Sequence, residues 1–184
     1  MKKVKMMRVG LLAILAAVLV FASSVSATNT SPTASRVIYF SIQNNLTCSD
    51  GSFNGNNYMS GFSLNLNNLG KYPAEATVYL YKKDGTEMVL SGFTTNGVAT
   101  DITPGEPVII APYATVQYFQ EYGFSSITAG SCSERPLYGK IVVDSDSGLL
   151  LASGEVFGRR IEIPSYDVTT YFNTTVNINN GQPF

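Results

Sequence analysis

The chain has 184 residues, with 12 Lys and Arg against 13 Asp and Glu, two cysteines, no tryptophan and no histidine. Without histidine there is no Ser-His or Cys-His nucleophile, no histidine metal ligand and no histidine general base. The basic residues are scattered rather than gathered into a run, which argues against a nucleic-acid partner.

Residues 1–27 have the pattern of a secretory signal peptide. Four basic residues precede an apolar run over residues 9–22, and Ala27 ends a small-residue motif after which we expect cleavage. The alternative is a retained membrane anchor, but the run falls short of the roughly 20 apolar residues that a spanning helix needs. We therefore expect a bacterial protein that is secreted or held at the cell surface, with no membrane contact after cleavage.

Removal of the signal changes the charge balance. Four of the 12 basic residues leave with residues 1–27, which contain no acidic residue, so residues 28–184 carry 8 basic against 13 acidic residues, a net charge of −5. Residues 28–34 are a polar leader that we expect to be flexible. The remainder, residues 35–184, has the length of one domain.

The two cysteines, Cys48 and Cys132, are expected to form a disulfide, because oxidising compartments pair the thiols of exported chains. The alternative is a reactive or metal-binding thiol, and it lacks histidine partners.

Short stretches of alternating apolar and polar residues follow one another along residues 36–157 and predict strands. Within residues 74–90, Val78 and Leu80 are expected to face a core, while Asp84-Gly85 turns the chain into a return strand over residues 87–90. A second hairpin is predicted around residues 144–148. The other predicted strands cover residues 36–42, 62–66, 108–110 and 115–122, and residues 43–60 are expected to form a loop.

The clearest alternation covers residues 166–178, where Tyr166, Phe172 and Ile178 are among the residues at every second position. This predicts a long C-terminal strand. It either closes the sheet of its own domain, which we expect as the ground state, or pairs with a neighbouring molecule. Eight or nine short strands with turns between them, and no convincing helical stripe, predict an all-β antiparallel sandwich.

Several segments together resemble small exported bacterial β-sandwich modules of the immunoglobulin-like type, similar to the CARDB and sensory-rhodopsin-transducer-like sandwiches. The resemblance covers about residues 60–158. It rests on the strand of residues 64–69, the hairpin of residues 74–85, the turn and strand of residues 104–112 and the strand of residues 139–143. It implies a non-catalytic binding or structural role, and no functional residue is carried over from it.

Two groups of acidic residues suggest chemistry. Asp144, Asp146 and Glu155 occupy the first, third and twelfth places of a calcium loop, but the glycine falls one place early, so a simple turn is the better interpretation and no metal is expected. A carboxylate pair for glycoside hydrolysis could come from four other acidic residues, although spacing cannot show that any two face each other. These are Asp101, Glu106, Glu121 and Glu134.

Polar and aromatic residues in predicted loops form a candidate ligand-binding patch for a glycan or peptide. They are Asn54, Asn56, Asn57, Tyr58 and Tyr113. We favour surface solvation as the explanation of these residues, because the chain has no tryptophan, the strongest stacking residue.

From these patterns we expect a secreted, non-catalytic protein without a cofactor that is a structural or adhesive component of the cell surface or extracellular matrix. It would associate with itself or with an envelope polymer. The alternatives are a glycan-binding or small-ligand module and, third, a small glycoside hydrolase.

Overall fold

We describe a computed structural model, and it describes residues 35–43, 46–51, 56–88, 100–123, 130–144, 148–162 and 168–184. The expected signal peptide and leader, residues 1–34, lie outside these ranges. No helix in the described part is long and apolar enough to cross a membrane.

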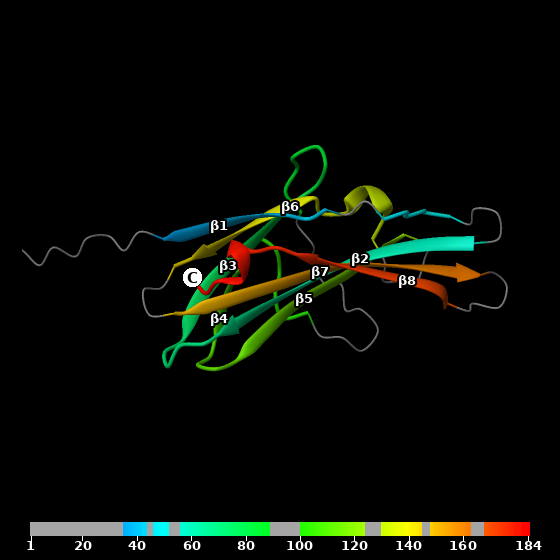
Figure 1. The fold of residues 1–184 in the computed structure, drawn as a ribbon. Helices are drawn as coiled ribbons and strands as arrows, with labels where there is room; N and C mark the ends of the chain where they lie inside the picture. Colours follow the sequence, from blue (N-terminus) through cyan, green and yellow to red (C-terminus); the bar gives the residue numbers. More distant parts are fainter. Residues whose placement is uncertain are drawn as a thin grey trace, which may run out of the picture. The chain divides into compact units, whose positions relative to one another are not determined.

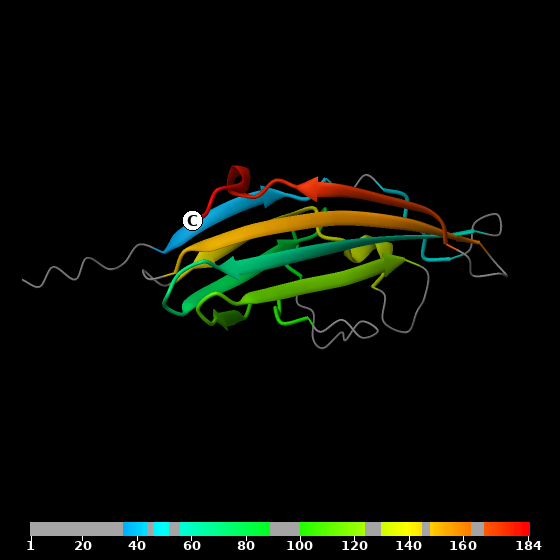
Figure 2. The ribbon, with the colours of Figure 1, turned by 60° about the horizontal axis from the view of Figure 1, so that its bottom comes forward.

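The described residues form two four-stranded antiparallel sheets that face each other (Figures 1 and 2). This confirms the expected all-β sandwich. The first sheet has the order β1 (Arg36–Ser41), β6 (Tyr138–Val143), β3 (Ala74–Tyr81) and β4 (Pro107–Ile110). The second has the order β5 (Thr115–Gly123), β2 (Asn56–Asn68), β7 (Leu150–Glu162) and β8 (Val168–Val176). Two short 3-10 helices, η1 (Cys132–Glu134) and η2 (Asn179–Gly181), complete the described elements.

The core lies between the two sheets and follows the predicted alternation. Val78 and Leu80 of β3 are fully buried, as the sequence predicted. They face buried residues of the second sheet, including Phe62 and Leu64 of β2 and Val156 of β7. Burying these side chains is the main favourable contribution to folding of such a domain, at about 25 cal/mol for each Å² of apolar surface removed from water.

Cys48 and Cys132 form a disulfide, with their Cα atoms 5.8 Å apart. Arg135 reinforces this link, because its guanidinium donates hydrogen bonds to the carbonyl oxygens of Cys132 and Leu46, each at 2.9 Å. The segment before β2 is thereby tied to the segment before β6. A disulfide of this kind is compatible with an extracellular location.

Both predicted hairpins need correction. The turn after β3 forms, with Gly85 at a φ of 85°. Of the predicted return strand, however, Glu87 makes only an isolated bridge to Tyr81. Val89 and Leu90 lie outside the described residues. The chain around residues 144–148 joins β6 to β7, which belong to different sheets, so it is a crossing between layers and not a hairpin.

The C-terminal strand folds back onto its own sheet, where β8 pairs with β7. The prediction extended it to Ile178, but it ends at Val176. Asn179 and Asn180 then have positive φ angles of 48° and 52°, and these turn the chain. Its predicted beginning, Tyr166, lies outside the described residues.

Candidate functional site: the outer faces of the two sheets

The outer face of the first sheet carries a row of aromatic side chains around one lysine. Tyr39 of β1 and Tyr79 of β3 are both register partners of Lys140 on β6. One rung further, Tyr138 of β6 is the partner of Tyr81 on β3. Side chains on opposite strands at the same rung point to the same side of a sheet. We call these five residues the tyrosine face.

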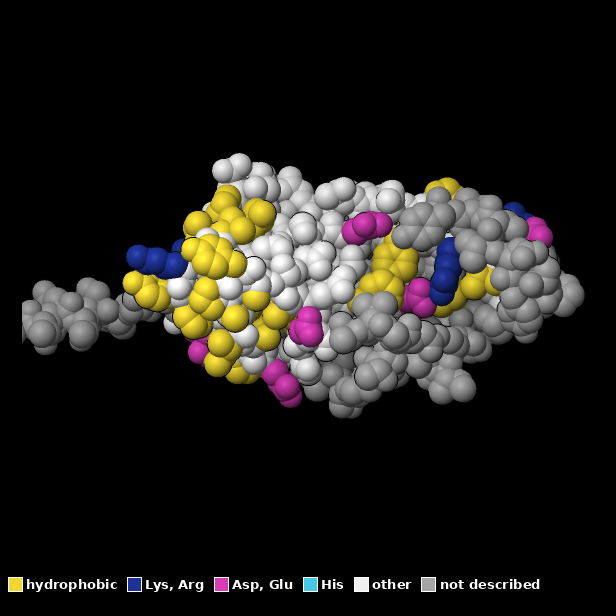
Figure 3. Space-filling model, turned by 90° about the horizontal axis from the view of Figure 1, so that it is seen from below, with side chains coloured by type: hydrophobic (Ala, Val, Ile, Leu, Met, Phe, Trp, Pro, Cys, Tyr) yellow, Lys and Arg dark blue, Asp and Glu magenta, His cyan; other side chains and the backbone are white. Residues whose placement is uncertain are grey.

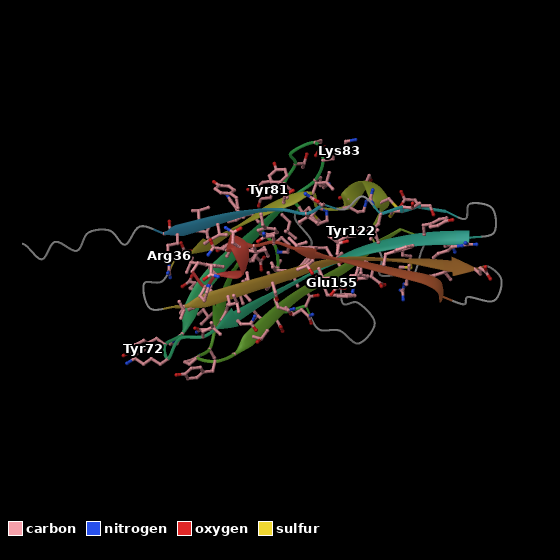
Figure 4. The ribbon with its side chains drawn as sticks, viewed as in Figure 1. Arg36, Tyr72, Tyr81, Lys83, Tyr122 and Glu155 are labelled. Atoms are coloured by element: carbon pink, nitrogen blue, oxygen red, sulfur yellow. A yellow bond between two sulfur atoms is a disulfide. The ribbon has the colours of Figure 1, made fainter. Side chains whose placement is uncertain are left out.

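Two rings of the tyrosine face, those of Tyr81 and Tyr138, stand upright on the sheet. Tyr81 and Tyr138 stack with their centroids 4.8 Å apart and their planes at 12°. That distance equals the spacing of neighbouring strands, so the two rings stand side by side and turn their edges outward. Figure 4 shows Tyr81 projecting away from the sandwich, while Tyr122 lies between the sheets.

Lys140 is held within this cluster. Its ammonium group lies 4.3 Å from the centroid of the Tyr79 ring and 5.9 Å from that of Tyr81. A hydrogen bond with the Tyr81 hydroxyl and attraction to the neighbouring tyrosines raise the pKa of Lys140 above its ordinary value. The lysine therefore stays charged at all physiological pH values, and the aromatic rings limit its freedom.

The tyrosine face is well exposed for an aromatic surface. Tyr39 is 73 % exposed and Tyr138 is 40 % exposed. Val37, on the next rung of β1, is also exposed, and so is Ile109 on β4. An extended group of exposed apolar and aromatic side chains on a sheet face usually marks a contact surface.

The outer face of the second sheet is different. Much of it is neither hydrophobic nor charged, and Figure 3 shows these side chains and the backbone in white beside a hydrophobic patch flanked by acidic and basic groups. In that patch the rings of Phe119 and Phe157 stack at 5.2 Å, and Arg159 forms an ion pair with Glu121 at 2.9 Å. Together with Ser63, Gln117 and Glu155, these residues line a shallow groove of about 310 Å³.

The structure does not gather the predicted ligand-binding residues into one patch. Asn56, Asn57 and Tyr58 belong to β2 and not to a loop, and Asn57 is fully buried. Tyr113 is 76 % exposed but lies in the turn before β5, beside the far end of β2. About ten strand residues, or roughly 30 Å, separate it from Tyr58. Asn54 lies outside the described residues.

The calcium pattern is not assembled either. Asp144 follows β6 of the first sheet, whereas Glu155 lies on the outer face of the second. Asp146 lies outside the described residues. Within the described ranges, no three acidic or cysteine residues come together as metal ligands.

The four carboxylates considered for hydrolysis lie in separate surroundings. Glu121 pairs with Arg159, and Glu134 pairs with Lys82 at 2.6 Å. Asp101 accepts a hydrogen bond from the backbone N–H of Gln117 at 3.0 Å, and Glu106 is exposed. None of these contacts joins two of the four carboxylates.

Sequence reasoning missed the tyrosine face, although a signal was present. Once Val78 and Leu80 are assigned to the core, Tyr79 and Tyr81 must point outward. The sequence does not show that β6 places Lys140 and Tyr138 beside them, because that depends on the order of strands in the sheet.

No protein-family model and no curated protein matches the chain. One solved structure, titled "Crystal Structure of Thermotoga maritima 1070", aligns with 82 % of this chain and 99 % of its own chain, at 13 % identity and a TM-score of 0.37. Similarity at this level supports no conclusion about fold or function.

Proposed function

We propose that the chain is an exported, non-catalytic β-sandwich of the immunoglobulin-like type that serves as a structural or adhesive component of the bacterial cell surface or extracellular matrix. The tyrosine face is its contact surface. The observation that carries the proposal is the exposure of Tyr39 and Tyr138 beside Lys140 on a regular sheet face.

Tyrosine suits adhesion for a physical reason. Its ring provides a large apolar contact at low entropic cost, and its hydroxyl remains able to form hydrogen bonds. The upright rings offer edges and hydroxyl groups to a partner, not a flat platform, so the tyrosine face favours contact with a polymer or protein over stacking of single sugar rings. The disulfide between Cys48 and Cys132 adds the rigidity that such a component needs.

The test is adsorption to insoluble probes, namely purified bacterial cell-wall sacculi and a protein-coated film, measured with a quartz-crystal microbalance. We expect residues 28–184 to be retained in high salt, because aromatic contacts are not screened as ion pairs are. The double variant Tyr39→Ser/Tyr138→Ser should lose most of this retention. Tyr113→Ser is the matched control, since it removes an equally exposed tyrosine elsewhere and should change nothing. Equal retention of all three proteins would overturn the proposal.

The groove on the second sheet favours one second candidate, the binding of a small saccharide. Phe119 offers an aromatic wall, and Gln117 and Glu155 offer polar groups beside it. Retention on a cellulose column, elution by soluble cello-oligosaccharide and loss of binding in Phe119→Ala but not in Tyr39→Ser/Tyr138→Ser would favour this function.

A further inference from the structure

Among the residues that the structure describes, the sandwich has four edge strands, and they differ in how they are protected. An unprotected edge exposes a row of backbone N–H and C=O groups that can pair with another chain, so proteins usually shorten, cover or charge their edges. The edges are β1 and β4 in the first sheet and β5 and β8 in the second.

Three of the edges carry such protection. The outer edge of β5 is covered, because Asp101 donates its backbone N–H to Gln117 at 2.8 Å and Gly130 exchanges hydrogen bonds with β5. β4 has four residues and begins with Pro107. β1 has six residues and begins with Arg36, whose guanidinium bonds the carbonyl of Gly148 at 2.8 Å.

β8 is neither shortened nor charged, although Ser41 and Gln43 lie near its last residues, where they and Thr174 line a hollow of about 200 Å³. It is nine residues long, and its sequence VTTYFNTTV contains no charge, no proline and no glycine. Within the described part of the chain, its only ladder is the one with β7. Its content of valine, threonine and aromatic residues is typical of strands.

Phe172, at the middle of β8, provides a second and independent observation. Its side chain is 53 % exposed although it lies at an apolar position of the alternation. With Leu46, Tyr58 and Arg160 it borders an open hollow of about 340 Å³ at the end of the sandwich. Phe172 has Gly158 as its register partner on β7, so on the other side of β8 its exposed ring can form a cross-strand pair with another chain.

We infer that β8 pairs antiparallel with β8 of a second copy of this chain, which joins the two second sheets into one continuous eight-stranded sheet. This inference deepens the structural role proposed above and rests on it. In the register that uses all nine residues, Phe172 faces Phe172 of the second copy, Thr170 faces Thr174, and Val168 faces Val176. The arrangement is symmetric and closes as a dimer.

The chemistry of β8 fits a second copy of the same strand. The strand is uncharged, so no like charges meet across the new ladder. The facing phenylalanines form a cross-strand aromatic pair, which stabilises antiparallel sheets. Donation of β8 to a neighbour, the alternative expected from the sequence, would first break its ladder with β7, whereas edge pairing keeps that ladder intact.

Sedimentation velocity on residues 28–184 tests the dimer. We expect a dimer for the unmodified protein and a monomer at the same concentration for Phe172→Lys and for Thr174→Lys, because each places a charge on the edge. Ser153→Lys adds the same charge to the same sheet on the inner strand β7, and it should remain dimeric. An unmodified protein that stays monomeric at every concentration, or edge variants that stay dimeric, would overturn the inference.

A cross-linking experiment tests the register. Facing residues of an antiparallel pair have Cα atoms about 4.5 to 5.5 Å apart, which is within the reach of a disulfide. Phe172→Cys should therefore form a covalent dimer under oxidising conditions. Thr175→Cys should not, because residue 169 faces it. Thermal melting by circular dichroism confirms that each variant is folded, and a folded Phe172→Cys variant that does not cross-link would contradict this register.

The experiments distinguish failure of the β8 dimer from failure of the adhesive role. A folded, monomeric Thr174→Lys variant should keep adsorption through the tyrosine face. If Tyr39→Ser/Tyr138→Ser loses adsorption but remains a dimer, both the β8 dimer and the adhesive tyrosine face are supported. If the unmodified protein forms the dimer but does not adsorb, the pairing of β8 is supported and the proposed function is overturned.

Discussion

Gly61 allows Phe157 to lie across β2 on the outer face of the second sheet. A Cβ atom at residue 61 would come within 2.1 Å of the Phe157 ring. That ring is 7 % exposed and stacks on Phe119, so it cannot move aside without losing this contact. The glycine is required for a close approach of a side chain, and not for its backbone angles.

We therefore predict that Gly61→Ala lowers the free energy of unfolding by about 1 to 3 kcal/mol, the usual cost of overpacking. Urea denaturation measures the change. Gly51→Ala is the control, since no atom lies within 4 Å of the added Cβ there, and its stability should be nearly unchanged. Equal midpoints for the two variants would show that the Phe157 ring does not occupy this position.

The buried tyrosine pair of β5 predicts a loss of stability in alkali. The hydroxyls of Tyr118 and Tyr122 lie 3.2 Å apart between the sheets. Burial raises the pKa of both hydroxyls well above the ordinary value of 10.0. An acid whose pKa is raised by folding stabilises the folded state fully below its unfolded pKa, and this contribution falls as pH rises above about 10, where the unfolded tyrosines ionise.

Urea denaturation between pH 9 and 11 should then show the free energy of unfolding falling by up to about 2.7 kcal/mol per pH unit. Each of the two tyrosines contributes up to about 1.4 kcal/mol per pH unit to this slope. The double variant Tyr118→Phe/Tyr122→Phe should show a shallower fall. Tyr113→Phe is the control and should keep the original slope, because Tyr113 is exposed and lies outside this buried pair. The explanation is wrong if the slope is the same in all three proteins.

At the scale of elements, the sequence predicted where strands occur more reliably than which strands pair with each other. The inward phase of β2 and β3 was predicted because Phe62, Leu64, Val78 and Leu80 alternate with polar or tyrosine residues, and this local pattern is enough to choose a face. The length of β2 was underestimated. Its first residues, from Asn56, are polar and resemble a loop. They nevertheless pair with the C-terminal end of β7, where Asn56 is the register partner of Glu162.

Strand order could not be obtained in this way. The turn at Asp84-Gly85 predicts a local hairpin, but β3 finds its main partners in β6 and β4, which are distant in sequence. The same limit applies to the candidate site. Tyr39, Tyr79 and Lys140 come from three strands, and only the pairing of β1, β6 and β3 brings them together.

At the scale of the whole molecule, the last residues of the chain close the sandwich. After β8, η2 turns the chain so that Phe184 exchanges backbone hydrogen bonds with Leu150 at 2.7 and 2.8 Å. Ile178 and Phe184 are both buried in the core. The predicted alternation ends at Ile178, so the burial of Phe184 was not predictable from the sequence pattern.

This arrangement predicts that Phe184→Ala costs about 3 to 5 kcal/mol, the usual range for removing a buried phenylalanine. Deleting residues 177–184 should cost more, because it also removes Ile178. Phe184→Leu keeps most of the apolar volume and should cost less than about 1.5 kcal/mol. Urea denaturation gives the three values. The variants leave β8 intact, so folded samples should still pair through Phe172. A truncated protein as stable as the full chain would show that the C-terminal residues do not form part of the core.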